Sequence, residues 1–441
     1  MSLASEYEQT IRDFRLPDLG ALQDEEFILP QYGGYSIANL ARTIVALFGK
    51  EQDETLAQPG LEPALPGSAW KHLAGGVRTV IVVVLDAVGY LGFKRLLERE
   101  ETGFGPLVEN GTFVPLTSVF PSTTMAAMSS IWTGRTPADH GFLGRRLFLA
   151  DYGFLADMIR LMPAIHGRPG SLMDRGWVPE GFIPVPHLAQ LLWDAGCRTV
   201  AHLYGPHAGG GLSRLFLRGV EHIEGFINYS DMWINVRDTV AQRTEAPLLV
   251  SAYWAGTDDV AHTYGPEDER LEAAVRQIAQ SFERDFLAPL PAAAREGTVV
   301  IITSDHGQVE TPPERAVHLK EHPELKEMLL WPPSAEPRAS YLHVRRGCTE
   351  KARDYTVSHL ADRFLVLDME QAVAAGVFGP GEIPGESRNR LGDLLLLARD
   401  DSRLIPEGAS AVSYTHLTLP TTIKPGGCRW WEVHFKLVGV G

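Results

Sequence analysis

The feature that most constrains the fold of this chain is a series of short runs of Val, Ile and Leu. These runs are separated by stretches with a helical pattern. The clearest run is TVIVVVL at Thr79–Leu85, which is far too short to span a bilayer. Similar runs occur at Leu248–Trp254, Thr298–Thr303 and Leu391–Ala398, with a shorter one near Thr199–Leu203. Strands that are apolar on both sides are typical of parallel sheets covered by helices. We therefore expect an α/β fold with a mostly parallel central sheet and helices on both of its faces.

Clusters of Pro and Gly suggest how the chain is divided. We expect residues 1–75 to form an N-terminal arm that packs on the core, and residues 76–411 to form one large α/β domain. A lid-like part is expected within that domain at about residues 313–388. Two helices of the large α/β domain are expected outside the lid-like part, at His187–Gly196 and at about Glu267–Phe286.

The segment Val412–Gly441 does not continue the preceding pattern. Its beginning, VSYTHLTLPTT, resembles the translation of a common sequencing adapter, whereas the alternative is a natural, strand-rich terminus. We treat the segment as a non-native tail, exclude it from the fold prediction and expect that the natural C-terminus is missing.

The chain is acidic, with 40 basic and 55 acidic residues and a formal charge of −15. This charge disfavours nucleic-acid polymers and anionic membranes as main partners. An anionic small ligand would then need local positive charge, which a bound metal ion supplies. The N-terminus lacks the pattern of a signal peptide, and three cysteines in 441 residues do not form a disulfide framework. We expect a cytoplasmic protein, and the sequence leaves its oligomeric state open.

Acidic residues follow three of the expected strands. Asp86 directly follows the first run, and Asp258 and Asp305 come shortly after the runs that end at Trp254 and Thr303. A single Asp after a strand is usually a turn residue or a helix cap. Since ligands of open α/β sheets bind at the carboxyl ends of strands, however, we expect these three acids to meet in one crevice.

Two of these acids are accompanied by a histidine. His262 follows Asp258 by four residues, which places both on one face if the segment is helical. His306 directly follows Asp305 in the sequence TSDHGQ. Carboxylate oxygen and imidazole nitrogen are suitable ligands for zinc or a similar divalent ion.

Three hydroxyl residues, Ser122, Thr123 and Thr124, precede an expected helix at Met125–Trp132, for which Gly134 suits the C-cap. One side-chain oxygen is enough to cap a helix. The start of a helix also favours an anion, and a metal ion at that place would lower the pKa of an alcohol. One hydroxyl is therefore expected to cap the helix, and a spare one is a candidate nucleophile.

In chain order, the motifs LDAVG, FPSTT…TGRTPADHG, GTDDVAHTYGP and TSDHG resemble the nucleotide pyrophosphatase/phosphodiesterase branch of the alkaline phosphatase superfamily. The resemblance runs from about Val77 to Gln308, and LPQYGGYSIANL in the N-terminal arm is a looser match to bacterial members. It implies an alkaline-phosphatase-like catalytic domain and a phosphohydrolase that cleaves phosphodiester or pyrophosphate bonds.

The resemblance also implies two divalent metal ions, zinc first and Mn or another divalent ion as alternatives. The implied ligands are Asp86, Thr124, Asp305 and His306 for one ion, and Asp258, His262 and a C-terminal histidine for the other. It selects Thr124 as the nucleophile, which attacks phosphorus and forms a phosphothreonine that water hydrolyses. The implied substrate is a small phosphorylated molecule, with a nucleotide as one candidate.

The sequence departs from the family pattern at two points. Eukaryotic relatives place a phosphate-supporting Asn three residues after the nucleophile, where this chain has Ala127, and no histidine stands where the last ligand is expected. We assign no sixth protein ligand. Of the other histidines near these motifs, His140 and His343 are expected to be structural, and His318 and His322 lie on a polar, helix-like segment where they are poorly placed as ligands. His416 and His434 belong to the expected tail.

Two alternative functions remain open. Within the same fold, the chain could be a phosphomonoesterase, phosphonate hydrolase or phosphomutase. A sulfatase is disfavoured, since FPSTTMA lacks the Pro and Arg of the sulfatase pattern. From a different class, the chain could be a non-catalytic metal- or phosphate-binding protein, because Ala127 and the absent ligand weaken the site.

Overall fold

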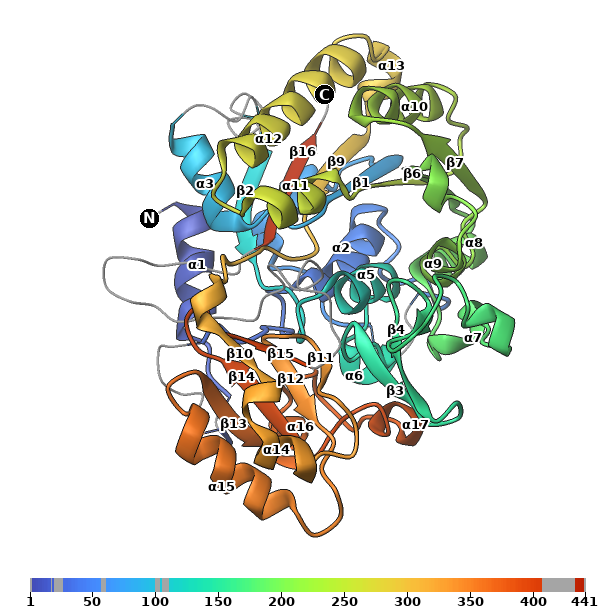
Figure 1. Cartoon of the computed structure of the whole chain (residues 1–441). Helices are drawn as coiled ribbons and strands as arrows, with labels where there is room; N and C mark the ends of the chain where they lie inside the picture. Colours follow the sequence, from blue (N-terminus) through green and yellow to red (C-terminus); the bar gives the residue numbers. More distant parts are fainter. Residues whose placement is uncertain are drawn as a thin grey trace.

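The computed structural model describes residues 2–16, 18–19, 27–56, 61–99, 104, 111–406 and 433–439. Its central sheet has the strand order β2-β16-β9-β1-β8-β6-β7 (Figure 1). The strands are β1 Thr79–Leu85, β2 Gly111–Leu116, β6 Arg198–Tyr204, β7 His222–Phe226, β8 Leu248–Trp254, β9 Thr298–Thr303 and β16 Val433–Gly439. The pairs among β9, β1, β8, β6 and β7 are all parallel, as predicted.

The first apolar run is buried on both sides because its alternate residues enter different cores. Val80, Val82 and Val84 pack in one cluster, together with residues of the helix Thr124–Thr133 and with N-terminal residues such as Ile44. Ile81 and Val83 pack in the other cluster, which is formed with the helices on the opposite face. Both faces of β1 are thus apolar, which is why the sequence shows a continuous run rather than alternation.

A second sheet lies below the central one in Figure 1, with the order β13-β14-β12-β11-β3-β4-β5 and only antiparallel pairs. Its strands are β3 Arg146–Leu149, β4 Phe154–Asp157, β5 Met162–Pro163, β11 Ser334–Ala335, β12 Ala339–Leu342, β13 Phe364–Asp368 and β14 Leu394–Ala398. A further parallel pair joins β10 Ala316–His318 to β15 Arg403–Ile405. The apolar run Leu391–Ala398, which we predicted as a strand of the parallel sheet, therefore belongs to the antiparallel one.

Strand β16 lies within the segment that the sequence analysis set aside. It pairs antiparallel with β2 on one side and with β9 on the other. The remaining residues of that segment lie outside the described ones, as does Cys428.

Helices cover both faces of the central sheet (Figure 1). The α-helices are α1 Leu3–Asp13, α2 Leu40–Leu47, α3 Tyr90–Glu98, α5 Thr124–Thr133, α6 Pro137–His140, α7 Pro179–Phe182, α8 Leu188–Asp194, α9 Gly211–Phe216, α10 Tyr229–Ala241, α11 Gly256–Tyr264, α12 Glu269–Ser281, α13 Ala292–Arg295, α14 Pro323–Met328, α15 Thr349–Leu360, α16 Met369–Ala374 and α17 Gly385–Arg388. A π-helical turn, Phe282–Leu287, continues α12. None of the described helices is long and apolar enough to cross a membrane.

Candidate active site

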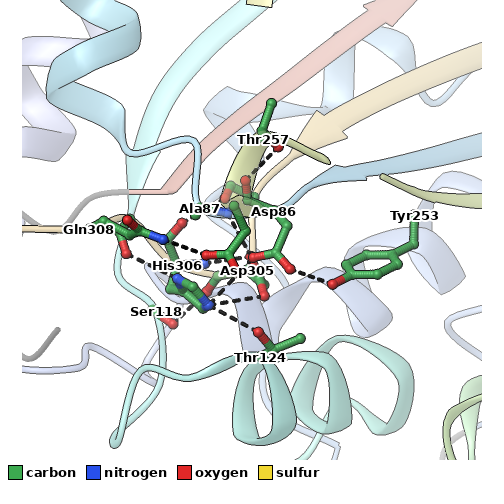
Figure 2. Close-up of polar contacts among 12 residues, drawn as sticks. Asp86, Ala87, Ser118, Thr124, Tyr253, Thr257, Asp305, His306 and Gln308 are labelled. Carbon is green, nitrogen blue, oxygen red and sulfur yellow. Dashed lines mark hydrogen bonds and ion pairs between the residues drawn. The ribbon is translucent and has the colours of Figure 1, made fainter. Parts of the chain in front are cut away.

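The three acids that follow strands meet at one edge of the central sheet, as Figure 2 shows for Asp86 and Asp305. Strands β8 and β9 both pair in register with β1, so their carboxyl ends lie on either side of its end. The amide N–H of Asp86 donates to the carbonyl of Trp254 at 3.0 Å, and Asp305 Oδ1 accepts the amide N–H of Ala87 at 3.2 Å. The loops after all three strands are therefore joined directly.

Asp86, Asp305 and His306 each offer a ligand atom within 4.8 Å of the others, and all three are buried. His306 Nε2 lies 3.5 Å from Asp86 Oδ1 and 3.5 Å from Asp305 Oδ2. The hydroxyl of Thr124 lies 3.1 Å from the same nitrogen (Figure 2). Four of the residues that the sequence analysis selected thus share one small volume.

The second predicted pair lies on α11. Asp258 and His262 are four residues apart on this helix, and His262 Nε2 lies 3.1 Å from Asp258 Oδ2. The expected i, i+4 geometry is therefore present. The other oxygen, Asp258 Oδ1, accepts a hydrogen bond from the side-chain amide of Gln308.

The sequence analysis did not select Gln308, although it directly follows the TSDHG motif. Its Oε1 atom is buried and has no hydrogen-bond partner among the described residues. Gln308 therefore connects the loop that carries Asp305 and His306 to the helix that carries Asp258.

Hydroxyl groups hold the loops that carry Asp86 and Asp305 in place. Thr257 donates to the carbonyl of Asp86 at 2.6 Å, and Ser118 donates to the carbonyl of Asp305 at 2.6 Å. The ring of His306 is oriented through Nδ1, which lies 3.0 Å from the carbonyl of Gly307. Such partners fix a ligating side chain before a metal arrives.

Glycines let the same two loops touch. A Cβ atom added at Gly307 would lie 3.1 Å from the Cα of Gly89, and one added at Gly89 would lie 3.3 Å from the Cα of Gly307. These glycines belong to the LDAVG and TSDHG motifs, so each motif supplies both a carboxylate and the space for the other loop.

Crowding of carboxylates dominates the electrostatics of the site. Burial raises the pKa of Asp86 well above its usual value of 3.8, and the nearby Asp305 and Asp258 carboxylates raise it further. Tyr253 donates a hydrogen bond to Asp86 Oδ2 (Figure 2), and its own pKa is raised well above 10 by burial and by Asp86. Burial also raises the pKa of Asp258, but the hydrogen bond and charge of His262, together with His306 and Gln308, more than offset this and leave the pKa below 3.8.

The residues present fit a divalent cation. Asp86 Oδ1 and Asp305 Oδ2 are buried and have no hydrogen-bond partner among the described residues. Buried carboxylate oxygens of this kind are costly unless a cation or a donor meets them. With His306 they form a set of oxygen and nitrogen donors that zinc prefers.

The start of α5 differs in one detail from the expectation. The helix begins at Thr124 and ends before Gly134, whose φ of 63° is the left-handed conformation predicted for the C-cap. Thr123 occupies the N-cap position, but its side chain makes no capping hydrogen bond. Thr123 therefore does not supply the side-chain cap that was expected from one of the hydroxyls, and the first-turn N–H groups have no side-chain partner from that residue.

Two charged residues that flank strands of the second sheet, Glu336 and Arg145, come near the start of α5, where Glu336 lies beside Thr123. Neither was selected from the sequence. Glu336 Oε1 accepts the backbone N–H of Arg145 at 2.7 Å, and the Arg145 side chain pairs with Asp157 at 3.0 Å. Burial raises the pKa of Glu336 to about 7, although the Arg145 charge acts in the opposite direction. The turn before Glu336 contains Ala335 at a φ of 59°, and this turn packs against Gly144.

The other histidines have partners away from the site. His140 Nε2 lies 2.9 Å from the Ser130 hydroxyl, and its Nδ1 accepts the N–H of Phe142 at 3.1 Å. His343 lies 2.7 Å from Ser334 Oγ, and His322 lies 3.1 Å from Tyr355 Oη. His318 lies in β10. Within the described ranges, none of these histidines joins the group formed by Asp86, Asp305 and His306.

The comparison with protein families gives one match. The family described as Type I phosphodiesterase / nucleotide pyrophosphatase matches residues 80–416. The chain belongs to this family. It is therefore a hydrolase of the phosphodiesterase and nucleotide pyrophosphatase type, as the motifs predicted. The comparison with curated proteins gives no match.

Solved structures show the same fold. Murine ectonucleotide pyrophosphatase/phosphodiesterase 5 superposes with a TM-score of 0.60 at 15% identity, over 82% of this chain and 88% of its own. Phosphonoacetate hydrolase from Sinorhizobium meliloti superposes with a TM-score of 0.56 at 18% identity, over 82% of this chain and 90% of its own. These neighbours confirm the predicted alkaline-phosphatase-like α/β fold.

Proposed function

We propose that this family member hydrolyses small phosphodiesters or pyrophosphates through a phosphothreonine at Thr124. The observation that carries the proposal is the position of the Thr124 hydroxyl, which lies 3.1 Å from His306 Nε2. This nitrogen lies 3.5 Å from each of two buried carboxylate oxygens that have no hydrogen-bond partner among the described residues. An alcohol is a weak nucleophile unless an adjacent group lowers its pKa. Thr124 lies beside the residues best suited to hold a cation that would do so.

Two divalent ions, zinc in the first place, would be held by two sets of side chains. Asp86, Asp305, His306 and Thr124 would hold one, and Asp258 and His262 would contribute to the other. When bound, such ions neutralise charge on the phosphoryl oxygens and lower the pKa of coordinated oxygens.

The chain's own residues would orient the phosphoryl group. Amides in the first turn of a helix have no partner within that helix and favour an anion, and Thr124 begins α5. The bond between Thr124 Oγ1 and phosphorus forms as the bond to one departing oxygen breaks, and the phosphorus keeps its other substituent. Water then cleaves the bond between Thr124 and phosphorus and releases the monosubstituted phosphate. Ala127, which is fully buried, has a methyl side chain and therefore offers no donor to the phosphate. The backbone amides would be the hydrogen-bond donors that this helix offers instead.

A structure of murine ectonucleotide pyrophosphatase/phosphodiesterase 5, described as an inactive Thr-to-Ala variant in complex with AMP, supports both the nucleophile and a small phosphorylated ligand. The phosphonoacetate hydrolase neighbour, described in complex with phosphonoacetate, favours a phosphonate hydrolase as the second candidate function. The thiols of Cys197 and Cys348 form no disulfide, which supports a cytoplasmic location as a further proposal.

The test uses the full chain, supplied with Zn²⁺ or Mn²⁺ or treated with chelator. It compares bis(p-nitrophenyl) phosphate, p-nitrophenyl phosphate and phosphonoacetate as substrates. We expect metal-dependent turnover that is fastest on the diester. Thr124→Ala is expected to lower kcat on the order of 10³-fold or more, whereas the exposed Thr55→Ala is the matched control.

Acid quenching during turnover of the diester should trap a phosphoryl group that still carries its second p-nitrophenyl ester on the peptide that contains Thr124, as detected by mass spectrometry. Undiminished turnover in Thr124→Ala would refute the nucleophile. Preferred turnover of phosphonoacetate would replace the leading function by the second candidate. Bound metal without turnover of any substrate would favour the non-catalytic alternative.

A further inference from the structure

A cavity of about 400 Å³ opens beside Thr124, Asp86 and Asp258. Its volume lies within the range of roughly 300–1,000 Å³ that is typical of small-molecule sites. Helices α5 and α9, which contact one another, supply residues to two of its walls. A group attached to a phosphorus atom at Thr124 would extend into this space.

The walls of the cavity are mainly apolar. Met125, Met128 and Trp132 lie along one side of α5 at spacings of three and four residues, which is the spacing of one helix face. Opposite them lie Leu212 and Phe216 of α9. Thioether side chains are flexible and adapt to apolar groups of irregular shape.

The polar side chains that line the cavity are already engaged within the protein. Ser213 donates to the carbonyl of Gly210 at 2.7 Å, and Ser251 donates to the carbonyl of Val200 at 3.5 Å. Tyr253 donates to Asp86. They therefore offer few free donors to the polar edge of a nucleobase.

His202 is a further polar residue that lines the cavity. Its Nε2 lies 3.1 Å from the Thr239 hydroxyl, and its Nδ1 lies 3.5 Å from Glu224 Oε2. Burial lowers the pKa of His202 to about 4, so this ring is neutral at pH 7 and attracts no anion.

The charges at the cavity disfavour an anionic occupant. Asp86 and Asp258 line it but belong to the proposed metal-binding sets, so Asp259 is the acidic lining residue outside those sets, and no Lys or Arg is among the described residues that line it. The exposed His207 lies at the same cavity. A carboxylate or a further phosphate that extends away from the proposed metal ligands would thus meet Asp259 and apolar side chains rather than a Lys or an Arg.

We propose that this cavity binds an uncharged, apolar substituent of the phosphoester, such as an alkyl or aryl group. The inference rests on the proposed function, because it takes the phosphorus atom to be held at Thr124. It narrows the substrate class to phosphodiesters with one apolar ester group.

A chain-length series tests the inference. The full metal-loaded chain is assayed with p-nitrophenyl alkyl phosphates from methyl to hexyl. Burial of one methylene corresponds to a change of about fourfold, so kcat/KM is expected to rise by about that factor per carbon until the cavity is filled. Binding of n-alkylphosphonates to Thr124→Ala, measured by calorimetry, should follow the same trend without any turnover.

Leu212→Lys is the informative variant, since Leu212 is only half-buried and a lysine can extend from that position. It should flatten the dependence on chain length in both assays. Ile234→Lys is the matched control, because Ile234 is 36% exposed on α10 and does not line the cavity. The control should retain the dependence.

The outcomes separate the two proposals. A flat chain-length series, with metal- and Thr124-dependent turnover of the methyl ester intact, would overturn the inference and leave the proposed function standing. A higher kcat/KM for p-nitrophenyl thymidine phosphate than for the hexyl ester would also overturn it. Absence of turnover for every ester would instead refute the proposed function, while alkylphosphonate binding would still report on the cavity.

Discussion

Replacement of Tyr253 by Phe tests whether the acidic cluster depends on a cation. Asp86 is 2% exposed, its Oδ2 accepts a hydrogen bond from Tyr253, and its Oδ1 has no hydrogen-bond partner among the described residues. Tyr253→Phe keeps the ring and removes this donor. Hydrogen bonds to charged groups contribute about 1.5–3 kcal/mol. We expect the variant to lose that much free energy of unfolding in chelator at pH 7.5.

The loss should depend on pH in a defined direction. Burial raises the pKa of Asp86 above its unfolded value of 3.8, so the stability that this group contributes is complete below about pH 4. It is lost as the pH rises through the folded pKa. Since the Tyr253 hydrogen bond lowers that pKa, the variant raises it further. The difference between variant and wild type should therefore vanish near pH 4 and grow toward neutral pH.

A bound cation should reduce the difference, because it would neutralise the carboxylate that lost its donor. Urea unfolding followed by tryptophan fluorescence, at pH 4 and 7.5 and with either EDTA or Zn²⁺, measures all four cases. Tyr264→Phe, which changes an exposed tyrosine at the end of α11, is the matched control. The reasoning fails if the loss is the same at both pH values, or if it is larger with metal than in EDTA.

Three further predictions concern the surroundings of the site. Gln308→Met removes the donor to Asp258 and should weaken binding of the ion proposed at Asp258 and His262 by about 10–100-fold. Calorimetry measures this affinity, with the exposed Gln242→Met as control, and an unchanged affinity would contradict the prediction. Because burial raises the pKa of Glu336 from 4.5 to about 7, the stability it contributes is complete below pH 4.5 and is lost as the pH rises through 7. Glu336→Gln should remove this dependence in urea titrations, and an unaltered pH profile would show that Glu336 does not titrate there. Gly307→Ala should destabilise the protein by about 1–3 kcal/mol and reduce the number of metal ions bound, as thermal melts and metal analysis would show; a fully metallated, equally stable variant would contradict the close contact.

Sequence reasoning was most successful where local patterns determine the structure. The bounds of β1, β8 and β9 match the apolar runs, because strands buried on both faces leave a continuous apolar signature. The acids after these strands lie together because parallel pairing aligns the carboxyl ends. The Asp258–His262 contact follows from helical periodicity alone.

The parts that sequence reasoning missed depend on contacts between distant segments. Tyr253 reaches Asp86 across 167 residues, and nothing in LLVSAYW distinguishes its hydroxyl from that of any strand tyrosine. Glu336 comes to the site with the second sheet, which joins β3 to β11 and β12. The run Leu391–Ala398 was assigned to the wrong sheet because an apolar run does not encode the direction of its partner.

The contact between Gly89 and Gly307 limits how far the carboxylates of the two loops can shift relative to one another. The two loops meet through bare backbone, so the spacing of the carboxylates they carry is limited by atoms that have no rotamers to adjust. Donor geometry must be held to roughly half an ångström for function, which is less than the width of a methyl group. A single carbon atom added at either glycine would therefore change the geometry of the metal-binding carboxylates. It would do so without contact to the reacting hydroxyl of Thr124, which is more than ten residues away in sequence from both glycines.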